Sequence, residues 1–312
     1  MRVFRGCPHP LLRVPTALAI GNFDGVHLGH QALLEHVVQA AQERGLVPSV
    51  VTFEPHPREV LKPDASHTRL STLYDKVIRI LETGIQRIYI LPFHPSLYHL
   101  SAQEFVREIL VEKLNTCWVT VGEDFRFGDK GEGSIDDLMR LGNEYHYETY
   151  ITPTFLHQGE RISSTRIRHA LDNNDFYDVQ MMLGHPYTMT GRVIHGRKLG
   201  RQLGFPTLNI APIPLWSHAK PAVNGIFAVR VKGLGPATLP GVASIGVKPT
   251  ISSDERYLLE TNVFDWKGDA YGKVVSIEFV ERLRSEKKFS GLEELKAAIN
   301  NDALQARRIL GA

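Results

Sequence analysis

The sequence has little cysteine, no long apolar run and almost no excess of charge. Its two cysteines, Cys7 and Cys117, are far apart, which excludes a disulfide framework or a cysteine zinc cluster and favours a reducing cytoplasm. No stretch approaches the roughly twenty apolar residues of a membrane span, and the first fifteen residues lack a signal-peptide core. A net charge of +2 gives no basic footprint for nucleic acid or for a membrane surface.

What the sequence does have is the composition of a globular protein, with 43% hydrophobic and 22% charged residues over 312 positions. In the first half, apolar strand patterns alternate with helical ones, as in TALAI followed by GHQALLEHVVQAAQERG. This alternation predicts an α/β domain over 1–185, built on a doubly wound parallel sheet. Ligands of such sheets bind at the carboxyl ends of the strands, where GNFDGVH, TFEPHP and GEDFRFG stand.

From about residue 187 the pattern changes to short strands separated by Gly and Pro, which predicts a small antiparallel β-barrel over 186–312. The six predicted strands lie in YTMTGRVIHG, TLNI, GIFAVRV, GVASIGV, YLLETNVFDW and KVVSIEFVERL. The amphipathic tail predicts a helix packed on the barrel. A stretch of about 130 residues has a normal domain size, so we expect residues 184–312 to fold as an independent domain and to keep their own activity without the first half.

The stretch GNFDGVHLGHQ, residues 21–31, predicts a phosphate site at the start of a helix. A helix N-terminus offers free N–H groups and a positive dipole end, and Gly29 permits close backbone approach. His27 and His30 share one face of the first turn and can donate to oxygens that gain charge when a phosphoanhydride breaks. Zinc is less favoured, because it would need an i, i+4 pair with a nearby Glu or further close ligands. Two surface histidines on a capped helix are the plain structural alternative.

The stretch GERISSTRIR, residues 159–168, gathers hydroxyl and guanidinium groups near a predicted helix start. The groups belong to Arg161, Ser163, Ser164, Thr165, Arg166 and Arg168. Together they favour a triphosphate, although an ordinary N-cap with exposed arginines would look similar.

The stretch GRKLGRQLGFPTLNI, residues 196–210, predicts a second phosphate site. It is not a Walker A loop, and a flexible hairpin is the simple alternative. Thr207 and Asn209 are two apart on a predicted strand, so they share one face and could hold Mg²⁺. Glu260 is a carboxylate in an apolar strand, which suits a general base for phosphoryl transfer or else an outward-facing edge residue.

The first half resembles the adenylyltransferase half of the bacterial bifunctional FAD synthetases, through GNFDGVHLGHQ, TFEPHP, GEDFRFG and ISSTRIR in this order. The resemblance implies that FMN phosphate attacks the α-phosphorus of ATP and expels pyrophosphate. It implies transition-state stabilisation by His27 and His30. The other implied site residues are Ser164, Thr165 and Arg168 for the leaving phosphates, Asn22 and Asp124 near the nucleotide, and Pro55, His56 and Pro57 beside the flavin.

The second half resembles riboflavin kinase, through the pattern G-x-x-x-G-x-x-x-G-x-P-T-x-N and three later stretches in the same order. The resemblance implies transfer of the ATP γ-phosphate to the terminal ribityl hydroxyl. Phosphate binding would fall to Gly196, Lys198, Gly200 and Gly204, Mg²⁺ to Thr207 and Asn209, and proton removal to Glu260. The chain departs from the family pattern at Ser244, Lys248 and Asn262, where the family usually has Asn, Arg and His.

The two resemblances together cover about residues 16–308 and predict a cytoplasmic enzyme that makes FMN from riboflavin and then FAD from FMN. ATP is the co-substrate of both steps and Mg²⁺ the cofactor, with small-molecule substrates and neither nucleic acid nor a membrane as partner. One alternative keeps only adenylyl transfer, because the departures all lie in the second half. Another is a flavin-binding regulatory or RNA-binding module without catalysis, which the retained histidines and Glu260 disfavour. The oligomeric state does not follow from the sequence.

Overall fold

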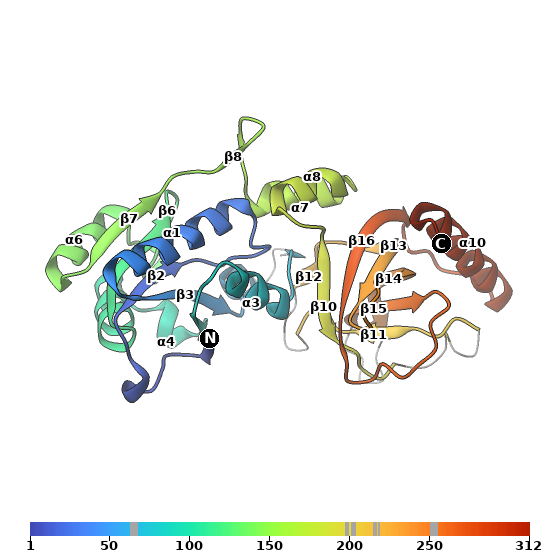
Figure 1. Ribbon diagram of the computed structural model, residues 1–312, viewed down its shortest axis with the longest axis horizontal. Coiled ribbons are helices and arrows are strands. Elements are labelled where there is room, and N and C mark those ends of the chain that lie inside the picture. The colour runs from blue at the N-terminus through green and yellow to red at the C-terminus, as the bar shows by residue number, and fades with distance from the viewer. Residues whose placement is uncertain (63–67, 197–199, 201–203, 215–216, 218, 250–254) are drawn as a thin grey trace. The chain divides into compact units, whose positions relative to one another are not determined.

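The computed structural model describes residues 1–62, 68–196, 200, 204–214, 217, 219–249 and 255–312. Its contacts divide the chain into two compact units, shown in Figure 1. The first unit contains Met1–Ala65 and Lys76–Ser163, and the second contains Ser66–Asp75 and Ser164–Ala312. Each unit is described by itself.

The first unit is built on a six-stranded sheet in the order β1-β5-β3-β2-β6-β7, and every neighbouring pair is parallel. The strands are β1 (Arg2–Arg5), β2 (Thr16–Ile20), β3 (Val47–Glu54), β5 (Arg87–Pro92), β6 (Thr116–Gly122) and β7 (Glu148–Thr152). All five residues of β2 are buried, as expected for a central strand covered on both faces. The predicted parallel sheet is confirmed, and its strand order reverses between β2 and β6.

The long helices of the first unit follow the apolar spacing of the sequence, and short helices lie between them. They are α1 (Leu28–Arg44), α2 (Pro57–Leu61), α3 (Leu73–Glu82), α4 (Pro95–Tyr98), α5 (Ala102–Glu104) and α6 (Ile135–Tyr145), and the unit boundary falls inside α3. Ser101 and Glu104 form a capping box, which a Ser followed three residues later by a Glu predicts. The helix that it starts continues over Phe105–Lys113 as a π-helix, whereas the sequence predicts an ordinary α-helix there.

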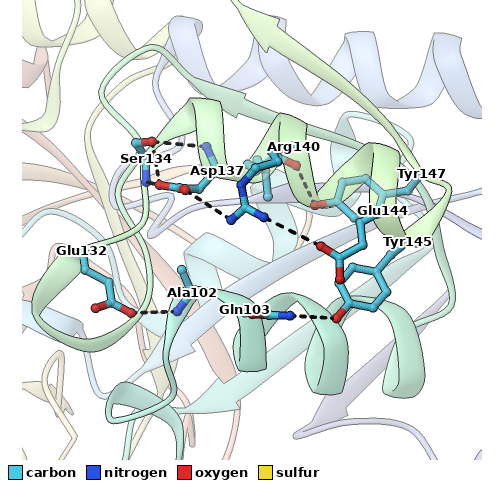
Figure 2. A network of polar contacts seen from close by, with 10 residues as sticks. Ala102, Gln103, Glu132, Ser134, Asp137, Arg140, Glu144, Tyr145 and Tyr147 are labelled. Carbon is cyan, nitrogen blue, oxygen red and sulfur yellow. Dashed lines mark hydrogen bonds and ion pairs between the residues drawn. The ribbon is translucent and has the colours of Figure 1, made fainter.

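Polar contacts fix the start of α6 and the loop before it (Figure 2). The Ser134 side chain accepts from the Asp137 N–H at 3.2 Å, and the Ser134 N–H donates to the Asp137 carboxylate at 3.0 Å. Two residues earlier, Glu132 accepts from the backbone N–H of Ala102 at 3.0 Å. Each contact satisfies a backbone donor at a helix start, so the last residues of the loop before α6 are tied to α5 and to α6 itself.

The second unit is an antiparallel six-stranded barrel in the order β10-β16-β13-β14-β15-β11. Its strands are β10 (Thr188–Arg192), β11 (Leu208–Ile210), β13 (Gly225–Lys232), β14 (Leu239–Pro249), β15 (Glu255–Val263) and β16 (Val274–Arg284), as predicted. A bridge between Ile194 and Asn209 joins the chain after β10 to β11, so the sheet nearly closes on itself.

Among the described residues, the second unit contains the helices α7 (Ser164–Asp172), α8 (Phe176–Leu183) and α10 (Leu292–Leu310), together with the start of α3. The tail helix α10 packs on the barrel strands, as predicted (Figure 1). Arg284, at the end of β16, forms a two-pronged ion pair with Asp302 of α10, at 2.8 and 2.6 Å. Asp302 is only 4% exposed, so this pair fixes the helix on the barrel.

The segment Ser66–Asp75 comes from the first half of the sequence but belongs to the second unit. Its strand β4 (Thr68–Arg69) pairs in parallel with β12 (Lys220–Pro221). The buried Asp75 carboxylate accepts from the Thr190 N–H at 2.8 Å, on the edge strand β10. The segment therefore covers an edge that would otherwise present open backbone groups.

Asp75→Ala is expected to destabilise the second unit by about 1–3 kcal/mol, because it leaves the buried Thr190 N–H without its acceptor. The measurement is amide hydrogen exchange of β10 in mild urea, with Asp75→Asn as a control that keeps one acceptor oxygen. Equal protection of β10 in the wild type and in the alanine variant would show that another group satisfies Thr190.

The predicted boundary between residues 185 and 186 stays a prediction. By contacts, α7 and α8 group with the barrel, and so does Ser66–Asp75. A fragment that starts at residue 184 lacks all of these, so its independent folding, expected from length alone, also stays a prediction.

Candidate active sites

The carboxyl ends of β2 and β6 meet at the point where the strand order of the first unit reverses. Open parallel sheets bind their ligands at such a point, because the connections leave it on opposite sides and open a crevice. Gly21 and Asn22 follow β2, and Asp124 follows β6. The sheet thus brings together the first and third stretches that the sequence predicts to bind the nucleotide.

The loop after β2 has an unusual backbone. Phe23, Gly25 and Val26 all have positive φ angles, of 49°, 86° and 41°. A β-branched residue such as Val rarely adopts this conformation, which costs free energy and marks functional sites. The Phe23 and Val26 side chains are buried, at 1% and 0% exposure, and hold the strained loop in place. The loop delivers His27 to the start of α1.

His27 and His30 form a stacked pair on the first turn of α1. Their ring centroids are 3.7 Å apart and their planes are inclined by 13°. His27 is the N-cap residue, and its Nδ1 accepts from the His30 backbone N–H at 3.2 Å. A Cβ on Gly29 would lie 3.3 Å from the His27 ring, so glycine leaves the ring its place over the turn. The predicted sharing of one face is confirmed.

Burial keeps both rings neutral near pH 7. Loss of solvent lowers the pKa of His27 to about 4; Asp24 opposes this shift, and Arg161 adds to it. Burial, and then the neighbouring His27, lower the pKa of His30 well below its ordinary value. Because the His27 Nδ1 is an acceptor, the proton of the neutral ring is on Nε2. The pair therefore offers neutral N–H donors rather than fixed positive charges.

The first unit is expected to lose stability in acid because of this pair. Folded His27 binds its proton more weakly than the unfolded chain, so protonation favours unfolding as the pH falls from 6.5 to about 4. The loss from His27 alone is about 3 kcal/mol, with more from His30 and no change above pH 7. His27→Asn keeps an N-cap and should flatten the pH dependence. The free energy of unfolding is measured by urea unfolding followed by Trp118 fluorescence, with Trp216 and Trp266 replaced by Phe. The same dependence on pH in the wild type and in His27→Asn would contradict buried neutral rings.

The other predicted nucleotide residues of the first unit have distinct surroundings. The Asn22 Oδ1 is buried without a hydrogen-bond partner among the described residues, so it is available to a ligand. Asp124 forms an ion pair with Arg161 at 2.9 Å, and both side chains are about half exposed or more. The structure thus brings Asp124 and Arg161 together, although they are far apart in the sequence.

The predicted flavin residues Pro55, His56 and Pro57 follow β3, beside β2 in the sheet. His56 is the N-cap of α2, its Nδ1 accepts from the Arg58 N–H at 3.2 Å, and its side chain is buried. Pro57 opens the helix, where a missing N–H does no harm. These contacts account for His56 and Pro57 structurally, and their flavin contacts stay a prediction.

Ser164, Thr165 and Arg168 lie on α7, in the second unit. Ser164 begins the helix, as the sequence predicts. The Arg168 Nε donates to the Thr68 carbonyl at 2.7 Å, which ties α7 to the segment Ser66–Asp75. The predicted phosphate contacts of these three residues stay predictions.

In the barrel, Glu260 lies in the middle of a polar row. The strand register places it opposite Asn209 of β11 on one side and opposite Ser244 of β14 on the other. Directly opposed residues of antiparallel strands are on the same face, with Cβ atoms about 5 Å apart. Asn209 is 5% exposed, and its Oδ1 has no hydrogen-bond partner among the described residues. Thr207 precedes β11 instead of lying in it, which corrects the predicted strand start.

The predicted glycine-rich loop is described only in part, and Lys198 lies outside the described residues. A Cβ on Gly196 would come within 2.6 Å of the Asn209 side chain, and a Cβ on Gly200 would collide with the Phe205 carbonyl. Gly204 has a positive φ of 87°. Packing or backbone conformation therefore explains why glycine stands at these positions. Their binding of phosphate stays a prediction.

The departures from the family pattern have their own contacts. The Ser244 Oγ donates to Glu286 at 3.5 Å, and the Asn262 Nδ2 donates to the Pro206 carbonyl at 2.8 Å. The Lys248 side chain lies outside the described residues. The contact of Asn262 with Pro206 could not be predicted from the sequence, because the two residues are far apart along the chain.

Comparison with known proteins matches both halves of the chain. The family model for FAD synthetase matches residues 12–166, and that for riboflavin kinase matches residues 183–310. A bifunctional riboflavin kinase/FMN adenylyltransferase of Escherichia coli K12 is 40% identical over 314 aligned positions, covering all of this chain and 98% of that protein. The chain belongs to this bifunctional family.

Other members of the bifunctional riboflavin kinase/FMN adenylyltransferase family match equally far. The Pseudomonas fluorescens protein is 40% identical over 93% of this chain and 91% of its own length. The Haemophilus influenzae protein is 37% identical over 98% and 95%. A crystal structure named macrolide-efflux protein from Streptococcus pneumoniae matches with a TM-score of 0.72 and 27% identity over 96% of both chains.

Two searches of the structure bear on the alternatives. Among the described residues, no group of three or more His, Cys, Asp or Glu side chains is placed to hold a metal ion. A search of the same residues for a helix that is long and apolar enough to cross a membrane also finds none.

Proposed function

We propose that the two activities of the family are divided between the two units, with adenylyl transfer centred on His27 and His30 and phosphoryl transfer on Glu260. The chain is an enzyme that phosphorylates riboflavin to FMN and adenylylates FMN to FAD. Its substrates and products are riboflavin, FMN, FAD and ATP. The division is supported by one observation: each half matched by a family model has buried polar atoms without a partner among the described residues next to its proposed catalytic residues. These atoms are the Asn22 Oδ1 and His30 Nδ1 in the first half, and the Asn209 Oδ1, opposite Glu260, in the second.

In the first unit, the stacked histidines stand at the start of α1, where backbone N–H groups and the helix dipole favour anionic phosphate. Neutral N–H donors bind an oxygen more strongly as its negative charge grows, so they stabilise the transition state more than bound ATP. The open Asn22 Oδ1 is an acceptor at the same end of the sheet, suited to an N–H or O–H of the nucleotide. Arg161 adds positive charge on the same side, since it acts on the pKa of both histidines.

In the barrel, Glu260 is placed to accept the proton of the ribityl hydroxyl when that oxygen attacks the γ-phosphorus. Thr207 and Asn209 fit Mg²⁺, a hard cation that prefers oxygen, because the buried Asn209 Oδ1 is otherwise unpartnered. When bound, Mg²⁺ supplies positive charge that offsets the charge of the ATP phosphates. The protein's own residues orient the hydroxyl against Glu260 and keep this carboxylate beside the metal ligands.

The test is to incubate the purified full-length protein with riboflavin, ATP and Mg²⁺ and to separate the flavins by chromatography. FMN followed by FAD supports both assignments. FAD that forms only from added FMN would select the chain that keeps adenylyl transfer alone. Bound flavin without any product would select the non-catalytic binding module.

Adenylyl transfer without kinase activity remains a second candidate, because Ser244, Lys248 and Asn262 all depart from the kinase pattern. The contacts of Ser244 and Asn262 show that these side chains are accommodated in the barrel. The cytoplasm is the proposed location, on the ground that Cys7 and Cys117 are both free.

A further inference from the structure

Asn262 is one of the residues at which the chain departs from the kinase pattern, and it makes one long-range contact. Its Nδ2 donates to the carbonyl oxygen of Pro206 at 2.8 Å. Asn262 is two residues after Glu260 on β15, so the two side chains are on the same face of the strand. The contact thus ties the strand of the proposed base to the segment just before the proposed metal ligands.

The contact fixes the backbone where these ligands begin. Proline already restricts its own φ, and a hydrogen bond to its carbonyl oxygen restricts the rotation that follows. The peptide plane between Pro206 and Thr207 is therefore restrained both by the proline ring and by the hydrogen bond from Asn262. Thr207 lies outside β11, so strand pairing does not hold it.

The next link passes from Thr207 to Asn209. The Asn209 Nδ2 donates to the Thr207 carbonyl at 3.3 Å. With the amide nitrogen held there, the buried Oδ1 is turned the other way, and it has no partner among the described residues. A Cβ on Gly196 would meet this amide at 2.6 Å, so the side chain is closely confined. Small shifts of Pro206 would therefore move the Oδ1.

We propose that Asn262 is a positioning residue of the kinase site, which holds the turn Pro206–Thr207 so that Thr207 and the Asn209 Oδ1 face the same site as Glu260. The proposal rests on the kinase roles proposed above for these three residues. In this chain, the side-chain N–H of Asn262 donates the hydrogen bond that a ring N–H could donate where the usual pattern has His. The departure at this position is then a replacement of one donor by another.

The test compares Asn262→Ala, Asn262→Asp and Asn262→His in the full-length protein. Asp keeps the size of Asn but cannot donate when ionised, whereas His keeps an N–H donor. Asn301→Asp, at an exposed position of α10, is the matched control for the added charge. The first readout is amide hydrogen exchange of residues 204–210 without metal or nucleotide, and the second is the kinetics of both reactions.

We expect the Ala and Asp variants to exchange at 207–210 about tenfold faster than the wild type, with exchange in β13 unchanged. Their kcat/KM for Mg²⁺·ATP in riboflavin phosphorylation should fall about three- to tenfold, whereas FMN adenylylation stays as in the wild type. The His variant should restore both readouts to within about threefold of the wild type.

Unchanged exchange and kinetics in Asn262→Ala would overturn the proposal. So would a His variant no better than Ala, because the donor would then not matter. Faster exchange throughout the barrel would also overturn it, since Asn262 would then be a residue of general stability. A wild-type protein that forms no FMN would refute the kinase assignment instead, and hydrogen exchange would still decide whether Asn262 holds the turn.

Discussion

Replacing His30 with alanine is expected to abolish FAD formation and to leave the phosphorylation of riboflavin intact. His30 stacks on His27 at the first turn of α1, and its Nδ1 is buried without a partner among the described residues. Removal of one donor aimed at developing charge typically lowers kcat by about a hundred- to a thousandfold. The measurement is the rate of FAD formation from added FMN and ATP, alongside the rate of FMN formation from riboflavin.

The matched control is His36→Ala, farther along the same helix. The His36 ring stacks on Tyr150, with centroids 4.2 Å apart, and is outside the motif at the helix start. The control should keep both activities. Kinase activity is assigned to the second unit and does not report whether the first unit is folded. Hydrogen exchange of β2 must therefore show that the first unit of each variant is folded. A folded His30→Ala protein with near wild-type FAD formation would refute the role of His30.

Glu260→Gln is expected to remove riboflavin phosphorylation while FMN is still converted to FAD. Glutamine has almost the size of glutamate and keeps one acceptor oxygen, but it cannot take up a proton near pH 7. Loss of a general base typically lowers kcat by about a hundred- to ten-thousandfold. Since the polar row with Asn209 and Ser244 stays filled, the effect on stability should be small beside the catalytic one.

The control for lost charge is Glu281→Gln, at an exposed position of β16 in the same barrel. It should phosphorylate riboflavin at the wild-type rate. If Glu260→Gln also phosphorylates riboflavin normally, then Glu260 is a structural residue of β15 and the proton goes elsewhere. A rise in KM without a fall in kcat would point to a role in binding rather than in proton transfer.

Local patterns were enough to predict the long helices of the first unit and the main strands of both units. The strand β2 is apolar from Ala17 to Ile20, and the helix α1 repeats its apolar residues at helical spacing, so both follow from the sequence pattern. His27 as a helix start and the capping box at Ser101 follow from local backbone chemistry in the same way. The predicted ligand stretches lie at strand ends for the same reason.

Features that depend on distant residues could not be predicted in this way. The strand β1 (Arg2–Arg5) has mostly exposed residues and no apolar alternation, and its pairing with β5 gives it its structure. The positive φ of Val26, in the loop that leads to His27, is a conformation that no propensity favours. The contact of Asn262 with Pro206 and the membership of Ser66–Asp75 in the second unit depend on the tertiary fold.

The place of Ser66–Asp75 has a consequence for synthesis on the ribosome. The segment is translated before Lys76–Ser163, yet its partners in the second unit, such as Thr190, come only afterwards. At about 5–20 residues per second, the segment waits on the order of 5 to 20 seconds for those partners. The second unit therefore includes a piece of chain that is synthesised well before the rest of the unit. Its contacts are complete only when Ser66–Asp75, which leaves the ribosome early, binds to the later part of the unit. Slower translation of Lys76–Ser163 therefore prolongs the time for which Ser66–Asp75 lacks these contacts.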